Sequence, residues 1–108
     1  MKLVILESPY AGNVADNETY ARSCVRDSLE RGEAPIASHL LYTQPGVLDD
    51  TDPDERAQGI ASGLEWLKKA DASVFYVDRG ISDGMLQGML DAQKWGVQIK
   101  LRKLKTKP

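Results

Sequence analysis

The sequence is poor in the residues that build covalent or metal-bound frameworks: it has one cysteine, Cys24, and one histidine, His39. A single cysteine excludes a disulfide within the chain and suits the reducing cytoplasm, where we expect the protein to be. There is no cysteine–histidine cluster for zinc, and the acidic run DDTDPDE lacks the spacing and central glycine of a calcium-binding EF-hand. We therefore expect no metal and no cofactor. Cys24 falls on the apolar face of an expected helix, so we interpret it as a buried thiol.

Long hydrophobic runs and a strong charge of one sign are also missing. No stretch approaches the eighteen or more apolar residues of a membrane span, and the start MKLVILES does not fit a signal peptide. With a net charge of −2, the chain has no general attraction for nucleic acids or anionic membranes. We expect no membrane association, no direct nucleic-acid binding and a single domain spanning residues 1–108.

Two common phosphate-binding motifs are absent as well. The sequence has no GxxxxGK[ST], which excludes a P-loop nucleotidase. It also has no GxGxxG, which excludes the usual dinucleotide fingerprint. Any nucleotide would have to be bound by another kind of loop.

Hydrophobic periodicity divides the chain into alternating strands and helices. Short apolar runs predict strands at residues 3–6 (LVIL), 35–38 (PIAS) and 72–77 (ASVFYV), and the alternating VQIKLRKL predicts a half-exposed edge strand at residues 97–104. Helical spacing predicts helices over residues 13–31 and 82–95, ended by Gly32 and Gly96.

The clearest helix start lies at residues 52–55, DPDE. Asp52 is placed as the N-cap, Pro53 suits the first helical position, and Glu55 completes a capping-box pattern. Carboxylates here also complement the helix dipole, which explains the acidic run without a metal. The apolar stripe of this helix, which we expect to be buried, consists of Ile60, Gly63, Leu64 and Leu67.

The resulting order, β-α-β-loop-α-β-α-β, predicts an α/β fold with a mostly parallel sheet and helices on both faces. In such sheets ligands bind beyond the carboxyl ends of the strands. Three loops rich in polar residues meet at that edge, which is the strongest indication of a binding site. They are residues 8–13, 39–50 and 78–84.

The loop before the last helix reads GISDGM and leaves two roles open for Ser82. Its hydroxyl can cap the helix, which is the ordinary role of a serine at that position. Alternatively, the hydroxyl and the free N–H groups near Gly84 can hold an anion such as a phosphate.

The other two loops offer groups for a base or a sugar. In SPYAGN, the ring of Tyr10 can stack on a base while backbone near Gly12 contacts a phosphate or ribose, or the turn simply joins a strand to a helix. His39 can bind a ligand or move a proton, or make a structural hydrogen bond.

Five stretches of sequence resemble one known family when taken in order. They are SPYAG, N-x-x-Y-A-R, GEAPIASHLLY, LDDTDPDER-x-x-GI-x-x-GLEWLKKAD and D-x-GIS-x-GM-x-x-G, and the similarity runs from Leu3 to about Leu101. The chain thus resembles the nucleoside 2-deoxyribosyltransferase-like proteins, and within them a small, uncharacterised bacterial and phage branch.

The resemblance implies a flavodoxin-like (Rossmannoid) three-layer sandwich with a four- or five-stranded sheet, and a dimer or larger oligomer. Active members cleave or exchange the N-glycosidic bond of deoxyribonucleosides or their 5′-monophosphates through a glutamate nucleophile. In nucleotide-cleaving members this glutamate follows a phosphate-binding serine in the pattern S-x-G-x-x-x-E. Ser82 and Gly84 match the pattern, but Gly88 stands where the glutamate is expected.

Two functional hypotheses follow. The first is a protein that binds a nucleotide, a nucleoside or a nucleotide-derived signal and has lost the nucleophile. The alternative is an active N-glycosidase or deoxyribosyltransferase that uses a relocated carboxylate, and a scaffold without a ligand is the third possibility. The candidate catalytic residues are Glu7, Asp78 and Asp83, and the candidate substrate-binding residues are Ser8, Tyr10, Gly12, His39, Asp71, Ser82, Gly84 and Met85. Asp91 has no obvious role, because an ideal helix rotates it away from position 88.

Overall fold

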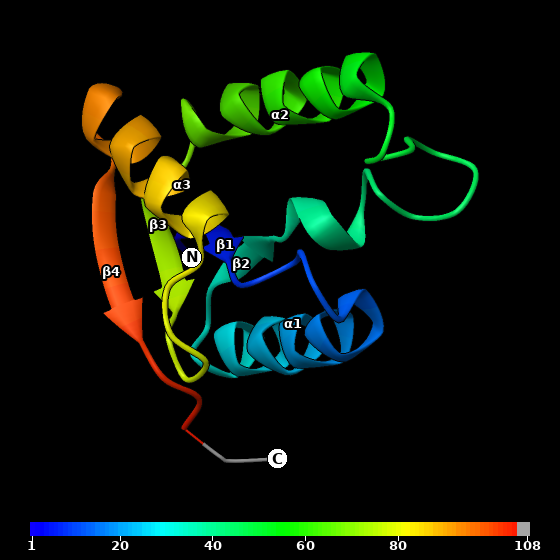
Figure 1. Ribbon diagram of the computed structural model, residues 1–108. Coiled ribbons are helices and arrows are strands. Elements are labelled where there is room, and N and C mark those ends of the chain that lie inside the picture. The colour runs from blue at the N-terminus through cyan, green and yellow to red at the C-terminus, as the bar shows by residue number, and fades with distance from the viewer. Residues whose placement is uncertain (106–108) are drawn as a thin grey trace.

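The computed structural model describes residues 1–105 and has a parallel sheet between two layers of helices (Figure 1). The sheet order is β2-β1-β3-β4, and all three strand pairings are parallel. Helix α1 covers one face, whereas α2 and α3 lie on the other. The expected α/β fold is therefore confirmed. The elements are β1 (Leu3–Glu7), α1 (Val14–Glu30), β2 (Ala34–Ile36), the 3₁₀ helix η1 (Ser38–Leu40), α2 (Pro53–Leu67), β3 (Ala72–Tyr76), α3 (Asp83–Lys94) and β4 (Gln98–Arg102).

The hydrophobic core lies mainly on the α1 side of the sheet. Alternate side chains of β1 and β3 point to this face and pack against α1, as the period of two in a strand requires. Cys24 is a fully buried member of this core, and burial raises the pKa of its thiol to about 12, which makes it unreactive at neutral pH. The buried core residues are Val4, Leu6, Tyr20, Cys24, Ala37, Ala72, Val74, Tyr76 and Leu104.

The edge strand β4 differs from its expected pattern. Leu101 is 56% exposed, whereas Arg102 points to the α1 side and is largely buried. The Arg102 guanidinium donates to both Glu33 carboxylate oxygens, at 2.7 and 2.9 Å, and lies 3.5 Å from the Tyr76 hydroxyl. The ion pair allows a charged side chain on the inner face, while α3 leaves Leu101 uncovered.

Helix α2 differs most from the sequence-based expectation. Asp52 caps it as predicted, accepting from the Asp54 and Glu55 N–H groups, but Glu55 accepts from the Asp49 N–H instead of closing a capping box. Of the expected buried stripe only Leu67 is buried, and Ile60 is 52% exposed. The stripe is open because its residues face a cavity rather than a packed sheet.

The chain leaves β2 earlier than the sequence predicts. The strand predicted at residues 35–38 ends at Ile36, because the Ser38 carbonyl accepts from the Leu41 and Tyr42 N–H groups and turns the chain into η1. None of the helices within residues 1–105 has the length and apolar character needed to cross a membrane.

Candidate functional site

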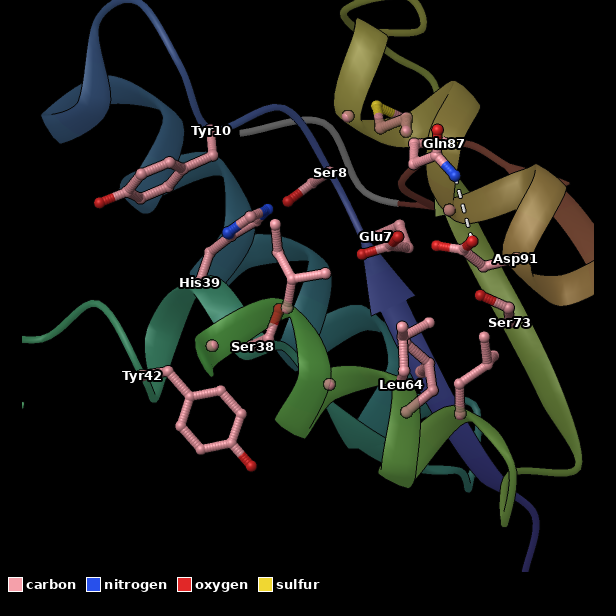
Figure 2. Close-up of a pocket in the computed structure, with 18 of the residues that line it drawn as sticks. Glu7, Ser8, Tyr10, Ser38, His39, Tyr42, Leu64, Ser73, Gln87 and Asp91 are labelled. Carbon is pink, nitrogen blue, oxygen red and sulfur yellow. Dashed lines mark hydrogen bonds between the residues drawn. The ribbon is translucent and has the colours of Figure 1, made fainter. Parts of the chain in front are cut away.

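A cavity of about 490 Å³ lies on the sheet face opposite α1, between the ends of β1 and β3 and the helices α2 and α3 (Figure 2). This volume falls in the range of small-molecule sites. All three of the loops predicted to meet at the carboxyl edge contribute to its lining. Its polar lining residues include Glu7, Ser8, Ser38, His39, Ser73, Ser82, Asp83, Gln87 and Asp91, and its apolar ones include Ile5, Ile36, Ile60, Leu64 and Leu67.

Glu7, the last residue of β1, sends its carboxyl group into this cavity toward α3 (Figure 2). The carboxyl group rests against the backbone of Gly88. A β-carbon built on Gly88 would overlap Glu7 Oε2 and would stand 3.2 Å from Glu7 Cδ and 3.4 Å from Phe75 Cε2. The bare backbone of Gly88 is therefore what makes room for the carboxyl group of Glu7.

The surroundings of Glu7 favour its protonated form. Burial, and after it the nearby charge of Asp91, raise the pKa of Glu7 from 4.5 to about 7. Near neutral pH this carboxyl group thus exists in both protonation states, which suits proton transfer or nucleophilic attack.

Asp91 also faces the cavity, although the sequence reading gave it no role. Gln87 Nε2 donates to Asp91 Oδ1 at 3.1 Å, and Figure 2 shows the Asp91 carboxylate turned toward Glu7. The signal was present in the sequence: Gln87 and Gly88 stand four and three residues before Asp91, and both spacings make neighbours on a helix surface. Three residues of helix rotate the chain by about 300°, which equals about 60° in the opposite direction, so Asp91 lies on the same side of α3 as Gly88.

The first two loops bring Tyr10 and His39 together at the cavity. Their rings stack with centroids 4.6 Å apart and planes 16° from parallel. Burial lowers the pKa of His39, so the imidazole is neutral at physiological pH. Ser8, the residue after Glu7, is buried and also lines the cavity. These three predicted residues thus lie at the candidate site.

The start of α3 shows Ser82 in its capping role. The Ser82 hydroxyl accepts from the Met85 N–H at 3.2 Å, and the Ser82 N–H lies 3.5 Å from the Met85 sulfur. Met85 is buried, and Asp83 places a carboxylate in the first helical turn. Ser82, Asp83, Gly84 and Met85 all line the cavity, but the hydroxyl expected to hold a phosphate is engaged with the helix.

Three candidates lie outside the cavity lining. Asp71 precedes β3, at the far end of the sheet, where Oδ2 accepts from the Leu3 N–H at 2.8 Å. Asp78 follows β3 but accepts from the Tyr20 hydroxyl and the Leu104 N–H, which places it on the α1 side. Gly12 has φ +98°, so its glycine serves the turn rather than the cavity.

The cavity lining also includes Tyr42, Trp66 and Ser73, which the sequence patterns did not indicate as site residues. Trp66 Nε1 donates to the Tyr42 hydroxyl at 2.7 Å, which joins α2 to the segment after η1 along the cavity. Ser73 is buried on β3, and its side chain faces the cavity beneath Asp91 (Figure 2). The alternation of β3 was hidden because all of its residues are buried.

The charges around the cavity are mainly negative. Glu7, Asp83 and Asp91 line it on the α3 side. At the other side Arg56 also lines it, but Arg56 Nη1 is paired with Asp50 Oδ2 at 3.0 Å. Among the described residues, no group of three or more acidic, histidine or cysteine side chains has an arrangement suited to a metal ion.

Comparisons with known proteins support the fold. The chain is similar to the structure of a 2-deoxyribosyltransferase from Bacillus psychrosaccharolyticus, with a TM-score of 0.72 and 15% identity over 92% of this chain and 70% of that one. It is also similar to a 2-deoxyribosyltransferase from Leishmania mexicana, with a TM-score of 0.66 and 12% identity over 100% of this chain and 68% of the other. The resemblance seen in the sequence is thus confirmed at the level of the fold. No curated protein sequence matches the chain. A family model described as a domain of unknown function (DUF7768) matches residues 2–102.

Proposed function

The chain belongs to the family described as a domain of unknown function (DUF7768), and from its cavity and fold we propose that it binds a nucleoside and cleaves or exchanges the N-glycosidic bond, with Glu7 as the reacting carboxylate. The observation that carries this proposal is the position of Glu7 against Gly88. The carboxyl group of Glu7, which extends from β1, lies where a β-carbon at position 88 would be, and in this proposal it replaces a glutamate at that position of α3.

The two sides of the cavity suit the two halves of a nucleoside. On the α3 side, carboxylates and hydroxyls can accept and donate hydrogen bonds to a sugar. A planar base can lie on the α2 side. It meets the stacked rings of Tyr10 and His39 there, together with the apolar residues of α2 that face the cavity. The solved structures with this fold include 2-deoxyribosyltransferases, which is consistent with such a ligand.

The charge pattern favours a nucleoside over its 5′-monophosphate. A phosphate at the start of α3 would meet Asp83, and the Ser82 hydroxyl is already the helix cap. Within residues 1–105, the Lys or Arg side chain that lines the cavity is Arg56, and Asp50 engages it. Negative charge brought into an acidic cavity without a free cation is unfavourable.

In the proposed reaction the ionised Glu7 attacks the anomeric carbon of the sugar. A bond forms between a Glu7 oxygen and that carbon, and the base leaves with the electron pair of the glycosidic bond and takes up a proton. Water, or a second base, then attacks the same carbon and gives up a proton, and the Glu7 carboxylate is released. The raised pKa of Glu7 predicts that the first step becomes faster as the pH rises through about 7.

The binding-only alternative differs in one respect. It is favoured by Gly88 itself, which stands where related nucleotide-cleaving proteins carry their nucleophile. In that case a nucleoside, nucleotide or nucleotide-derived signal occupies the cavity and Glu7 only accepts hydrogen bonds. Both readings predict ligand binding, and only the enzymatic one predicts a released base.

The test is incubation of the pure protein with a panel of deoxyribonucleosides, ribonucleosides and their monophosphates, followed by chromatography for free base. We expect base release from a nucleoside by the wild-type protein, and none by Glu7→Gln. Mass spectrometry of the quenched reaction should show a glycosyl adduct on the wild-type chain alone. Binding of a nucleoside by calorimetry, without base release from any member of the panel, would select the binding-only alternative.

The dimer implied by the family resemblance stays a prediction. Several leucines on the outer side of α3 and on β4 are well exposed and offer apolar surface for such contact, namely Leu86, Leu90 and Leu101. Sedimentation velocity on the wild-type protein and on Leu90→Lys tests this prediction, since a dimer formed through these residues should dissociate in the variant.

A further inference from the structure

Asp91 is an acidic residue of the cavity to which the proposed reaction gives no part. It lies on α3 one turn after Gln87, and the Gln87 amide holds its Oδ1 at 3.1 Å. Figure 2 shows the carboxylate between this amide and the carboxyl group of Glu7. The hydrogen bond fixes Asp91 on the cavity side of the helix, although an aspartate near the end of a helix would otherwise turn toward water.

The other groups around Glu7 leave Asp91 as the charge that acts on it most directly. On β3, the uncharged Phe75 is the sheet partner of Glu7, and the uncharged Ser73 lines the same cavity. From η1, His39 is neutral near pH 7, because burial lowers its pKa. The remaining charged groups of the lining are Asp83 at the start of α3 and the mutually paired Asp50 and Arg56 toward α2.

We propose that Asp91 is a positioning residue: its carboxylate, held beside Glu7 by Gln87, helps to retain the proton on Glu7 and moves the chemistry at this site to higher pH. Two carboxyl groups that face each other in a partly dehydrated cavity resist double ionisation, so a fixed negative charge on one retains the proton on the other. The inference deepens the proposed function and rests on it where it speaks of a reaction. The coupling between the two carboxyl groups, however, can be measured without any reaction.

The electrostatic surroundings of Glu7 agree with this assignment. Burial is the main cause that raises the pKa of Glu7 to about 7, and the charge of Asp91 is the second. Removing that charge should leave the burial contribution and lower the pKa only in part. The fall should be the smaller part of the difference between 4.5 and about 7, because burial is the larger cause.

The direct test is titration of the Glu7 carboxyl carbon by NMR, with its resonance assigned by its loss in Glu7→Gln. Asp91→Asn keeps the size of the side chain and an oxygen acceptor for Gln87 but removes the charge. We expect the Glu7 midpoint to fall by about half a unit to one unit in this variant. In Asp91→Glu, which restores the charge, we expect it to return toward the wild-type value. Asp83→Asn, on the same helix, serves as the matched control and should change the midpoint less.

Activity provides the second measurement. If the midpoint falls from about 7 to about 6, the ionised fraction of Glu7 at pH 6 rises from about one tenth to about one half. The kcat/KM of Asp91→Asn at pH 6 should then rise about fivefold, with little change in KM. A merely structural role for Asp91 would instead lower kcat/KM at every pH.

The outcomes separate the two proposals. An unchanged Glu7 midpoint in Asp91→Asn would overturn the role of Asp91, whether or not the wild-type protein releases a base. A lowered midpoint in a protein that releases no base from any nucleoside would support the role of Asp91 and refute the proposed reaction.

Discussion

The carboxyl group of Glu7 occupies the volume that any side chain on Gly88 would need. The two residues lie on different elements, β1 and α3, and are 81 positions apart in the sequence (88 − 7). The cost of a glycine inside a helix, about 1 kcal/mol relative to alanine, is therefore accompanied by a specific contact. A carboxylate can enter this part of the cavity from the strand or from the helix, but the two cannot be present together without rearrangement.

Gly88→Ala should displace Glu7. The added β-carbon overlaps Glu7 Oε2, so the carboxyl group must leave its position, and we expect the rate of base release to fall about tenfold or more. The Glu7 NMR midpoint should fall toward 4.5 as the group becomes hydrated. Gly63→Ala is the control for the alanine itself, because a β-carbon there has no atom within 4 Å. It should stabilise α2 by about 1 kcal/mol and leave the Glu7 midpoint unchanged.

A glutamate placed at position 88 of α3 tests whether it can take over the role of Glu7 on β1. Glu7→Ala should abolish base release, and Gly88→Glu alone should be destabilised because two carboxyl groups compete for one volume. The double variant, Glu7→Ala with Gly88→Glu, should recover base release by about tenfold or more over Glu7→Ala. If the double variant is as inactive as Glu7→Ala while circular dichroism shows an intact fold, the equivalence of the two positions is wrong.

The pKa of Glu7 also predicts how stability varies with pH. Because this pKa is raised from 4.5 to about 7 in the folded protein, the folded state holds the proton more tightly than the unfolded chain. Stability is therefore highest below about pH 4.5 with respect to this group, and it is lost as the pH rises to about 7, by about 3 kcal/mol at most. Urea unfolding at several pH values should show this loss in the wild-type protein but not in Glu7→Gln, which should be the more stable of the two at about pH 8.

Two other carboxyl groups act in the opposite direction and in a different pH range. Hydrogen bonds from Tyr76 and Arg31 lower the pKa of Asp27 against the effect of its burial, and the Arg102 hydrogen bonds lower that of Glu33. Their contribution is present above the ordinary carboxyl range and is lost as the pH falls below it. They do not mask the effect of Glu7 between about pH 5 and pH 7.

The stacked pair Tyr10 and His39 should contribute to binding rather than to the chemical step. Because the rings lie 4.6 Å apart, removal of one leaves the other free to turn out of the cavity. We expect His39→Ala to raise KM about tenfold with a smaller change in kcat, whereas His39→Phe keeps the stack and should remain close to wild type. A larger loss of kcat than of binding in both variants would instead indicate that the imidazole takes part in proton transfer.

Much of the fold was predictable from the sequence, because its signals are local. The apolar run before Glu7 and the Asp52-Pro53 helix start determine β1 and the beginning of α2 without reference to the rest of the chain. The openness of α2 was not predictable in this way. Its apolar spacing is the same whether the helix packs on a sheet or covers a cavity, and only the three-dimensional arrangement distinguishes the two.

The candidate site was predicted in part, for a related reason. Residues at the end of a strand or just after it, such as Glu7, Ser8 and Tyr10, lie at the cavity as parallel topology requires. Asp78 follows a strand too, but it turns to Tyr20 on the other face of the sheet, since one position in a strand or just beyond it decides the side. The helical spacing places Asp91 on the side of Gly88, but its position beside Glu7 depends on how α3 packs against β1. No local sequence pattern contains that information.

The two roles considered for Ser82, helix cap and phosphate ligand, predict different effects of substitution on stability and on ligand binding. Its hydroxyl accepts from the Met85 N–H at 3.2 Å, so Ser82→Ala should lower the free energy of unfolding by about 1 kcal/mol, as loss of an N-cap usually does. For a domain of this size that corresponds to a fall in Tm of roughly 4–8 °C. Ser82→Asp is the matched variant, because aspartate caps equally well but adds a negative charge where a phosphate would lie. We expect Ser82→Asp to keep the wild-type Tm and to bind nucleosides as the wild-type protein does. A thermal shift with a nucleoside monophosphate that is present in the wild-type protein and lost in Ser82→Asp would show instead that this helix start binds phosphate.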